Sequence, residues 1–388
     1  MDKVRILFVS HSSDLFGAEQ SLLDIMKGLD KRLFDPSLVC PRRGPLEEKA
    51  RNLGIRTYLV TYKYWLMRRK FSWRYLLYLP INFIGIFRIK RLIDRLGIDL
   101  VYTNTCTVIS GAFAGKLCGK KHVWHIHESI GNKELYFNLW GTHKNVFRAI
   151  YSLSDRIIVN SNSVRSQFPE ECRDRISVVY NGFDAAAYGI NSREREELRA
   201  KYGIKDKEKA VSVIGSISER KGQKNLVGAM PLILSRCPSV KLIIAGVSTD
   251  PKKRYEDELR GIIDSNRLHD AVKFVGFVDN ISEIYKITDC LVVPSNDEPF
   301  GRVVVEAMLF GVPVIAARVG GIPEIIENGR NGILIDSNEP AVIADAVVGL
   351  LNDDTLAGSY AAEARKGAAA RFGLRNMVKQ VEEIVRRA

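Results

Sequence analysis

Two glutamates spaced eight residues apart are the residues of this chain whose type and spacing most directly suggest chemistry. Glu298 and Glu306 frame Pro299-Phe300-Gly301, just after an apolar run that ends at Pro294. A carboxylate accepts two hydrogen bonds side by side, which suits the vicinal hydroxyls of a ribose. A helix is predicted to begin near Gly301, and its first turn would offer free N–H groups to an anion. Taken alone, however, the pair is better explained as a solvated loop residue and a helix-surface residue.

A second candidate site follows another predicted strand. Val211–Ile214 is an apolar run, and the loop that begins at Gly215 leads to Arg220 and Lys221 at the start of a predicted helix. A positive charge at this point would stabilise the negative charge that develops on a departing diphosphate. The alternative is that both side chains are solvated.

Histidines mark the end of a third predicted strand, His122–His127. On a strand, His125 and His127 point to the same face, and two histidines at this spacing can hold a metal ion. The sequence shows no further cluster of ligands beside them, so a metal site is not expected. His122 and His125 are expected to be core or surface residues.

The segment Glu-Pro-Phe-Gly-x-x-x-x-Glu-Ala, residues 298–307, resembles the glutamate-pair signature of retaining glycosyltransferases of the GT-B fold, specifically glycosyltransferase family 4. Further segments are similar to the same family: 178–184, 311–316, 320–326 and 331–334. The resemblance covers nearly the whole chain and is tightest from Val178 to Ile335.

This resemblance implies roles for individual residues. Glu306 would bind the nucleotide ribose, Glu298 would lie by the transferred sugar, and His127 would hydrogen-bond a sugar hydroxyl or the reacting oxygens. Lys221 matches the family's lysine, whereas Ser216 stands where the family usually has an arginine.

Two loops complete the implied site. Gly17-Ala18-Glu19 resembles the family's Gly-Gly-Ala-Glu loop, with Phe16 replacing the first glycine, and 276–279 would line the nucleobase. The implied catalytic residues are Glu298, His127 and Lys221. The implied donor-binding residues are Gly17, Ser216, Arg220, Lys221, Phe277, Val278, Glu298, Phe300, Gly301, Arg302, Val303 and Glu306.

Short apolar runs that alternate with helical patterns must position these residues. Such alternation is typical of parallel sheets with crossover helices. The first series of predicted strands is 5–10, 37–40, 57–60, 100–103, 122–127, 156–159 and 177–179. The second series is 210–214, 241–245, 272–275, 290–293, 314–316 and 332–335.

The length of 388 residues predicts two domains. The expected architecture is α/β: two Rossmann-like, doubly wound domains of GT-B type facing across a cleft, with ligands at the strand carboxyl ends. The expected ranges are 1–185 for an acceptor-side domain, 186–370 for a nucleotide-sugar domain, and 371–388 for a terminal helix packing back towards the first domain.

The formal net charge of +13 suggests a polyanionic partner. Lys63–Arg95, within the basic aromatic segment 62–95, interleaves nine basic residues with aromatic ones, and its apolar part is too short to span a bilayer. It is either an amphipathic stretch on an anionic membrane surface or a helical excursion packed on its own domain. No motif supports a nucleic-acid partner.

The compartment expected from the sequence is the cytoplasm, with peripheral attachment to the inner face of the membrane as one option. The start of the chain does not resemble a signal peptide, and the six cysteines form no Cys-x-x-Cys pair.

The expected activity is metal-independent, retaining transfer of a hexose or N-acetylhexosamine from a UDP- or GDP-sugar. The acceptor would be a glycan or lipid-linked molecule in surface polysaccharide or glycolipid synthesis, and no cofactor beyond the sugar nucleotide is expected. The alternatives are a sugar-nucleotide 2-epimerase of the same architecture and a non-catalytic, membrane-associated binding protein.

Overall fold

The computed structural model describes residues 3–66, 74–130, 143–189 and 192–388. The chain forms two compact units. Unit 1 comprises Met1–Gly182 and Leu374–Ala388, and unit 2 comprises Phe183–Gly373. The boundaries expected from the sequence were 185 and 370. Each unit is described separately below.

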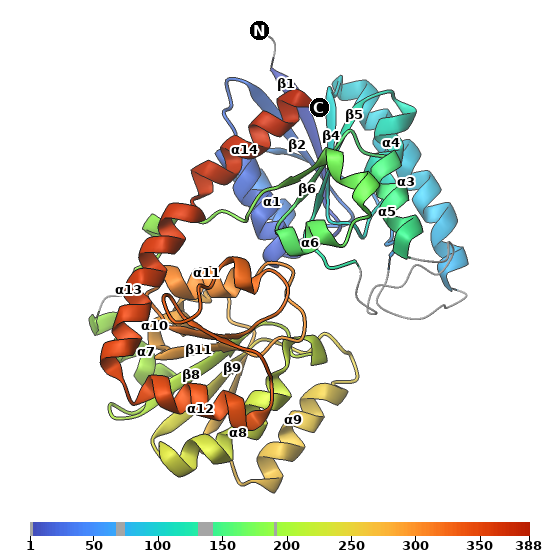
Figure 1. The fold of residues 1–388 in the computed structure, drawn as a ribbon. Helices are drawn as coiled ribbons and strands as arrows, with labels where there is room; N and C mark the ends of the chain where they lie inside the picture. The colour runs from blue at the N-terminus through green and yellow to red at the C-terminus, as the bar shows by residue number, and fades with distance from the viewer. Residues whose placement is uncertain (1–2, 67–73, 131–142, 190–191) are drawn as a thin grey trace. The chain divides into compact units, whose positions relative to one another are not determined.

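Unit 1 is built on a seven-stranded sheet of order β3-β2-β1-β4-β5-β6-β7, in which every pairing is parallel. Its strands are β1 (Val4–Val9), β2 (Phe34–Cys40), β3 (Arg56–Leu59), β4 (Leu100–Asn104), β5 (Lys121–Ile126), β6 (Arg156–Val159) and β7 (Ile176–Val178). Its helices are α1 (Gly17–Gly28), α2 (Pro45–Asn52), α3 (Arg74–Leu96), α4 (Ser110–Leu117), α5 (His143–Ser152), α6 (Asn162–Ser166) and α14 (Leu374–Arg387), with a 3₁₀ turn η1 (Glu170–Arg175). Figure 1 labels these elements along the chain.

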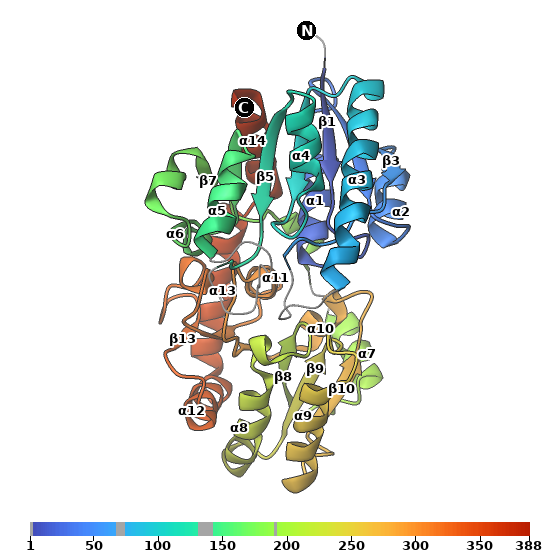
Figure 2. The same cartoon turned by 90° about the vertical axis from the view of Figure 1, so that its right-hand side faces the viewer.

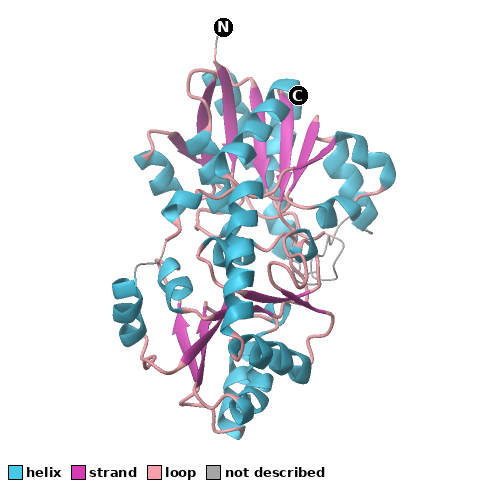
Figure 3. Ribbon diagram, turned by 60° about the vertical axis from the view of Figure 1, so that its left-hand side comes forward, coloured by secondary structure: helices cyan, strands magenta, loops and turns pink. Residues whose placement is uncertain are grey.

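Unit 2 repeats the plan with six parallel strands of order β10-β9-β8-β11-β12-β13. They are β8 (Lys209–Ile214), β9 (Val240–Ala245), β10 (Val272–Gly276), β11 (Cys290–Val293), β12 (Val314–Ala317) and β13 (Ile333–Ile335). The helices are α7 (Ser192–Lys201), α8 (Gln223–Arg236), α9 (Arg254–Ser265), α10 (Ser282–Ile287), α11 (Arg302–Leu309), α12 (Pro340–Leu351) and α13 (Asp354–Arg371); the 3₁₀ turns are η2 (Ala185–Ala187), η3 (Glu219–Lys221) and η4 (Ile322–Glu324). Figure 3 shows helices flanking the strands in each unit.

The strand order reverses once in each sheet. In unit 1 the chain winds outward from β1 to β3 and then returns to place β4 on the other side of β1; in unit 2 the same reversal separates β8 from β11. Ligands of doubly wound sheets bind outside the strand carboxyl ends at such a switch point. The topology therefore marks β1/β4 and β8/β11 as the places to look for a site.

The last helix, α14, belongs to unit 1 although unit 2 precedes it in the sequence. It contacts α1, and its buried side chains Met377, Val378, Val381 and Val385 join the core cluster of β1 and β2. At Gly28 the two helices pack closely, since a Cβ there would come within 2.6 Å of Val378 Cγ2 and would force that side chain to shift. The helix thus closes one face of the unit 1 sheet.

The predicted class of fold is confirmed, and all thirteen predicted strands are present with small shifts of boundary. The basic aromatic stretch forms α3 over its second half, whereas residues 67–73 lie outside the described residues. Within the described ranges, no helix is long and apolar enough to cross a bilayer. All six cysteines are free thiols.

Candidate functional site

The loops that follow β8 and β11 are joined directly at the switch point of unit 2. The backbone N–H of Asn296 donates to the carbonyl of Arg220 at 2.8 Å, and its side-chain amide donates to the carbonyl of Glu219 at 2.8 Å. Because the two strands are adjacent and parallel, their carboxyl ends meet at one edge of the sheet. The predicted basic and acidic residues are therefore neighbours, although 77 positions separate Lys221 from Glu298.

Lys221 and Glu298 form an ion pair that is almost fully shielded from solvent. The Lys221 ammonium donates to Glu298 Oε2, and each side chain is 11 % exposed. Burial raises the pKa of Glu298, but the charges of Lys221 and Arg220 and hydrogen bonds from Lys221 and Ser295 outweigh it and hold the pKa below its usual value. Glu298 is therefore a carboxylate at neutral pH.

Arg220 points towards the loop that carries Glu298. Its Nη1 donates to the carbonyl of Asp297 at 3.1 Å and lies 4.0 Å from Glu298 Oε2. Its Nε is buried and has no hydrogen-bond partner among the described residues. A buried guanidinium donor without a partner is costly, which suggests that an absent acceptor belongs beside it.

Glu306 lies in the second turn of α11, held by two donors. Tyr285 of α10 donates its hydroxyl to Glu306 Oε2 at 2.8 Å, and Arg302 Nη2 lies 3.4 Å from Oε1. Arg302 also stacks on Phe183, with its guanidinium carbon 4.5 Å from the ring centroid, and leaves Nη1 buried without a partner in the described chain. The carboxylate is thus fixed in orientation and retains acceptor lone pairs.

Glycines set the geometry of the loop after β11. Gly301 caps α11 with a φ of 108°, a conformation that other residues rarely adopt. Gly320 has a φ of 55°, and a Cβ there would lie 2.0 Å from the carbonyl oxygen of Glu298, to which the N–H of Gly321 donates at 2.9 Å. The loop after β12 therefore supports the backbone of Glu298 at contact distance.

The other residues predicted to bind a donor fall into two groups. Phe300 is 2 % exposed and packs edge-on against Phe372 at 5.7 Å, so its ring belongs to the core and only its backbone remains for a ligand. Phe277 is 62 % exposed just beyond β10, with Val278 half-buried next to it. Ser216 is half-buried in the β8 loop, and its carbonyl accepts from the Gln223 amide at 2.9 Å. Val303 is half-buried in the first turn of α11.

The switch point of unit 1 brings His127 to the start of α1. His127 follows the last residue of β5 and its Nε2 lies 3.0 Å from Asn104 Oδ1, at the end of β4. The Asn104 amide in turn donates to the carbonyl of Ala18 at 3.1 Å. This chain of contacts connects the ends of β4 and β5 with the start of α1 through polar groups, and Gly17 stands exposed beside it as the first residue of α1.

Glu19 organises the loop between β1 and α1. The side chain is 1 % exposed, accepts from Ser12 Oγ at 2.5 Å and from the Phe16 N–H at 3.2 Å, and lies 3.1 Å from His11 Nε2. A glutamate that accepts from the N-cap backbone is half of a capping box, here with Phe16 in the cap position. Glu19 therefore fixes the backbone around Gly17.

The two remaining histidines of this strand are core residues, as expected. Burial lowers the pKa of His122 to about 4 and that of His125 to about 3. His122 bonds to Thr103 at 2.8 Å, and His125 bonds to the Tyr102 hydroxyl at 2.7 Å. Both are therefore neutral at physiological pH. The described residues contain no group of three or more side chains suited to hold a metal ion.

Asn104 and Tyr285 are site residues that the sequence did not reveal. Asn104 had a signal, since the apolar β4 ends in the polar run Thr103-Asn104-Thr105. Tyr285 had none, because only the packing of α10 beside α11 brings its hydroxyl to Glu306.

Two doubly wound parallel sheets, with buried cations after β8 and an oriented carboxylate on α11, are the features of a glycosyltransferase of the GT-B fold. Residues 17–187 match the model of "Glycosyltransferase Family 4", and residues 194–367 match that of "Glycosyl transferases group 1". An uncharacterized glycosyltransferase of Methanocaldococcus jannaschii is 31% identical over 311 residues, 74% of this chain and 76% of that protein. The chain belongs to glycosyltransferase family 4.

Three further comparisons agree. N-acetyl-alpha-D-glucosaminyl L-malate synthase of Bacillus anthracis is 30% identical over 62% of this chain and 61% of its own length. The crystal structure of HepE from Anabaena in complex with UDP and glucose is 27% identical, covers 99% of both chains and has a TM-score of 0.83. A glycosyltransferase of Rickettsia africae, at 19% identity and a TM-score of 0.80, shares the fold.

Proposed function

We propose that this protein is a retaining, metal-independent hexosyltransferase. It transfers a hexose or N-acetylhexosamine from a nucleoside-diphosphate sugar to a glycan or lipid-linked acceptor in surface polysaccharide or glycolipid synthesis. The observation that carries the proposal is the pair of buried positive groups at the β8/β11 switch point, Lys221 and Arg220, together with Arg302 at the start of α11; Nε of Arg220 and Nη1 of Arg302 have no partner among the described residues. A diphosphate supplies the missing acceptors.

The proposed donor is a UDP-sugar, with a GDP-sugar as the second candidate. HepE has been crystallised with UDP and with UDP-glucose, and this chain aligns with it over nearly its full length. In the proposed complex, Glu306 accepts from the two ribose hydroxyls, and Phe277 and Val278 lie against the base. Gly17, Ser216, Val303 and the backbone of Phe300 and Gly301 complete the donor contacts.

In the proposed reaction, the acceptor hydroxyl attacks the anomeric carbon as the bond to the diphosphate breaks. Lys221 and Arg220 stabilise the charge that accumulates on the leaving phosphate, and that phosphate takes the acceptor proton. Attack occurs on the face from which the diphosphate departs, so the anomeric configuration is retained. Glu298, ionised beside Lys221, stabilises positive charge on the sugar, and His127 hydrogen-bonds a sugar hydroxyl or the reacting oxygens.

A thermal-shift series with UDP, GDP and UMP tests the donor site, because a ligand that binds only the folded protein stabilises it by mass action. We expect UDP to raise the midpoint most. Incubation with a panel of UDP- and GDP-sugars, each with and without acceptor glycans, then measures released nucleoside diphosphate. Release of UDP without any transferred sugar, together with an epimerised product, would instead identify a 2-epimerase.

A non-catalytic role on membranes is the other candidate. The exposed Phe83, Phe87 and Arg88 of α3 support contact with an anionic surface, and free cysteines suit a cytoplasmic protein on the inner face of the membrane. Absence of both UDP binding and UDP release, with vesicle binding retained, would favour this role.

A further inference from the structure

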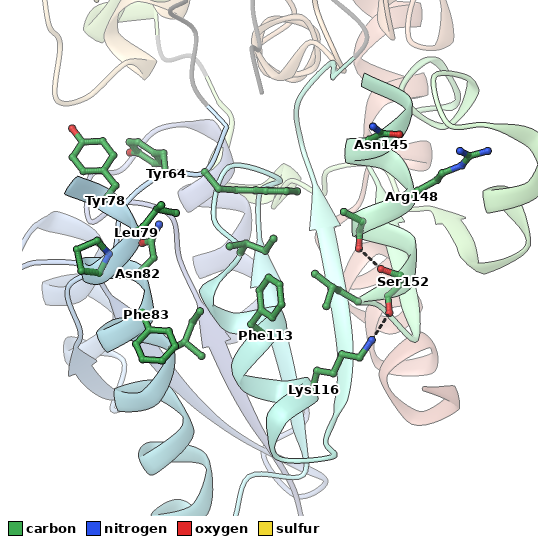
Figure 4. Close-up of a pocket in the computed structure, with 16 residues that line it drawn as sticks. Tyr64, Tyr78, Leu79, Asn82, Phe83, Phe113, Lys116, Asn145, Arg148 and Ser152 are labelled. Atoms are coloured by element: carbon green, nitrogen blue, oxygen red, sulfur yellow. Dashed lines mark hydrogen bonds between the residues drawn. The ribbon is translucent and has the colours of Figure 1, made fainter. Parts of the chain in front are cut away.

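A wide apolar groove in unit 1 has no part in the donor chemistry proposed above. Its volume is about 1050 Å³, and it lies among α3, α4 and α5. Figure 2 shows α4 between the other two helices, and Figure 4 shows the side chains that face the hollow. Phe83 and Ile86 come from α3, Phe113 from α4, and Ala149 and Leu153 from α5 and its end. We call this the α3–α5 groove.

The lining of the groove is accessible to solvent in the part of the chain that the structure describes. Phe83 is 63 % exposed and Phe113 is 38 % exposed. Folded proteins often expose single apolar side chains, but a contiguous apolar hollow marks a binding site. Small-molecule sites of mainly apolar lining span about 300–1,000 Å³, so the groove has room for a long hydrocarbon ligand.

Cations stand at the edge of the groove. Lys116 Nζ donates to the carbonyl of Ser152 at 3.3 Å. Arg148 lies 3.5 Å from Glu171, and the side chains of Arg148 and Glu171 are each more than half exposed. In Figure 4, Phe113 and Lys116 project from α4, whereas the guanidinium of Arg148 points away from the hollow. Lys116 and Ser152 precede β5 and β6, so this cation lies by the amino ends of the strands, while Arg148 is paired with Glu171. The lining between them is apolar and matches an occupant that is apolar along its length.

One end of the groove adjoins the strand ends of unit 1. Tyr64 lines the groove, and its ring centroid lies 6.3 Å from that of His11, which pairs with Glu19 in the β1–α1 loop. Trp65 also lines it, and its Nε1 donates to the carbonyl of Cys106 at 2.6 Å.

The same contacts continue to His127. The N–H groups of Cys106 and of His127 both donate to Glu128 Oε2, each at 3.1 Å. A ligand lying in the groove would therefore have one end beside residues that are direct neighbours of His11 and His127. This continuity distinguishes the groove from a patch that merely touches lipid elsewhere on the surface.

We propose that the α3–α5 groove binds the hydrocarbon chain of a lipid-linked acceptor and thereby delivers its phosphate-bearing end to the strand ends of unit 1. The proposal rests on the proposed transferase function, since it assigns the acceptor class. The chain is bound by apolar contact along α3, α4 and α5.

Binding of dodecyl phosphate to the full chain tests this directly. All four tryptophans lie between residues 65 and 140, and Trp65 lines the groove at the end where the phosphate is proposed to lie, so bromine atoms on the alkyl carbons nearest the phosphate should quench tryptophan fluorescence on contact. We expect saturable quenching that unlabelled dodecyl phosphate displaces and ethyl phosphate does not. Equal displacement by ethyl phosphate would mean that the site recognises only the phosphate and not the alkyl chain, and it would overturn the proposal.

Variants separate the groove from the rest of the apolar surface. Phe83→Ser removes a lining ring, and Ala149→Phe fills the hollow without adding polarity. We expect each to weaken dodecyl phosphate binding roughly tenfold, Phe83→Ser because apolar contact area is lost and Ala149→Phe because its ring occupies the space of the alkyl chain. Ile84→Ser is the matched control, since Ile84 is the next residue of α3, is 53 % exposed and does not line the groove; its affinity should stay unchanged.

Flotation with phosphatidylcholine vesicles containing phosphatidylglycerol distinguishes a bilayer-docking face. If Phe83→Ser and Ile84→Ser reduce vesicle binding equally while neither changes dodecyl phosphate affinity, the surface docks on a bilayer and the proposal is wrong. Absence of quenching by the brominated probe would also refute it. These readouts do not depend on catalysis, so a failure of UDP to stabilise the chain would overturn the proposed function separately.

Discussion

At the scale of single residues, the proposed donor site combines one charge pair with one carboxylate held by two donors. Lys221 neutralises Glu298 in a nearly dry environment, and Tyr285 and Arg302 orient Glu306. The two glutamates that look equivalent in the sequence therefore have different surroundings. This difference supports separate roles for them in the proposed reaction.

Lys221→Ala should reduce transfer by about 10²–10³-fold, the usual effect of removing one preorganised group that stabilises transition-state charge. The variant also leaves Glu298 buried without its main partner, so it should be less stable. Steady-state release of UDP together with thermal unfolding measures both effects. Pairing it with Glu298→Gln, which removes the orphaned charge, should restore stability but not activity; wild-type turnover in Lys221→Ala would contradict the assignment.

Glu306→Ala should lose both ribose acceptors, and we expect transfer to fall sharply while the fold remains intact. Glu324→Ala is a suitable control, because Glu324 is a glutamate of η4, after β12, that has no proposed contact with the donor. Calorimetric titration with UDP is the measurement. Unchanged UDP affinity in Glu306→Ala would show that Glu306 does not bind the ribose hydroxyls.

Tyr285→Phe deletes one hydroxyl and leaves the packing of the ring in place. Since a single hydrogen bond contributes about 0.5–1.5 kcal/mol, the KM for donor should rise about 2- to 10-fold, with a smaller change in kcat. A purely structural role would lower the unfolding midpoint and leave KM unaltered. Comparing donor KM with the unfolding midpoint therefore decides whether Tyr285 positions Glu306.

At the scale of secondary-structure elements, the alternation of apolar runs with helical patterns in the sequence predicted the strands of both sheets. Buried parallel strands consist of consecutive apolar residues, and each of these runs is visible in the sequence. Residues at strand ends, such as His127 and Lys221, could be placed because parallel strands end at one edge. Contacts between helices could not, since α10 and α11 meet only through the packing of their flanks, and Tyr285 carries no local signal.

The buried histidines of β5 make the stability of unit 1 depend on pH. His122 and His125 have folded pKa values of about 4 and about 3, below the usual value of 6.5. The unfolded chain therefore binds protons first as pH falls from about 6.5 towards about 4, and stability is lost in that window. Lowering pH from about 7 to about 5 should cost about 2 kcal/mol per histidine.

Urea unfolding followed by tryptophan fluorescence measures this, because every tryptophan of the chain lies in the part of the sequence that forms unit 1. His122→Gln should reduce the loss between the two pH values. A stability that stays constant across the window in the unaltered protein would show that these histidines titrate normally.

At the scale of the whole molecule, the proposed reaction needs no metal ion. A chelator should leave the rate of transfer unchanged, because the role of a cation at the diphosphate is assigned to Lys221, Arg220 and the start of α11. The measurement is UDP release with and without EDTA, followed by added Mg²⁺ or Mn²⁺. Loss of activity that either ion restores would refute metal independence.

Helix α14 also has a measurable consequence for unit 1. Val381 is fully buried in the core cluster of β1 and β2. Val381→Ala should destabilise unit 1 by about 1–3 kcal/mol through lost burial and a residual cavity. Lys379→Ala, at an exposed position of the same helix, is the control. Both are read from tryptophan fluorescence during urea unfolding, and equal midpoints for the two would contradict the packing.

Because α14 completes unit 1 from the far end of the chain, the order of synthesis and the order of folding differ. A ribosome releases all seven strands of the first sheet before it begins unit 2, yet the helix that covers them emerges only after residue 373. At a synthesis rate of about 5–20 residues per second, α14 follows the end of the first sheet by about 10–40 s. During this time the apolar side of β1 and β2 is not covered by the helix. The nascent chain thus has a period in which unit 2 can finish first, and in which a holding chaperone has an apolar surface to recognise.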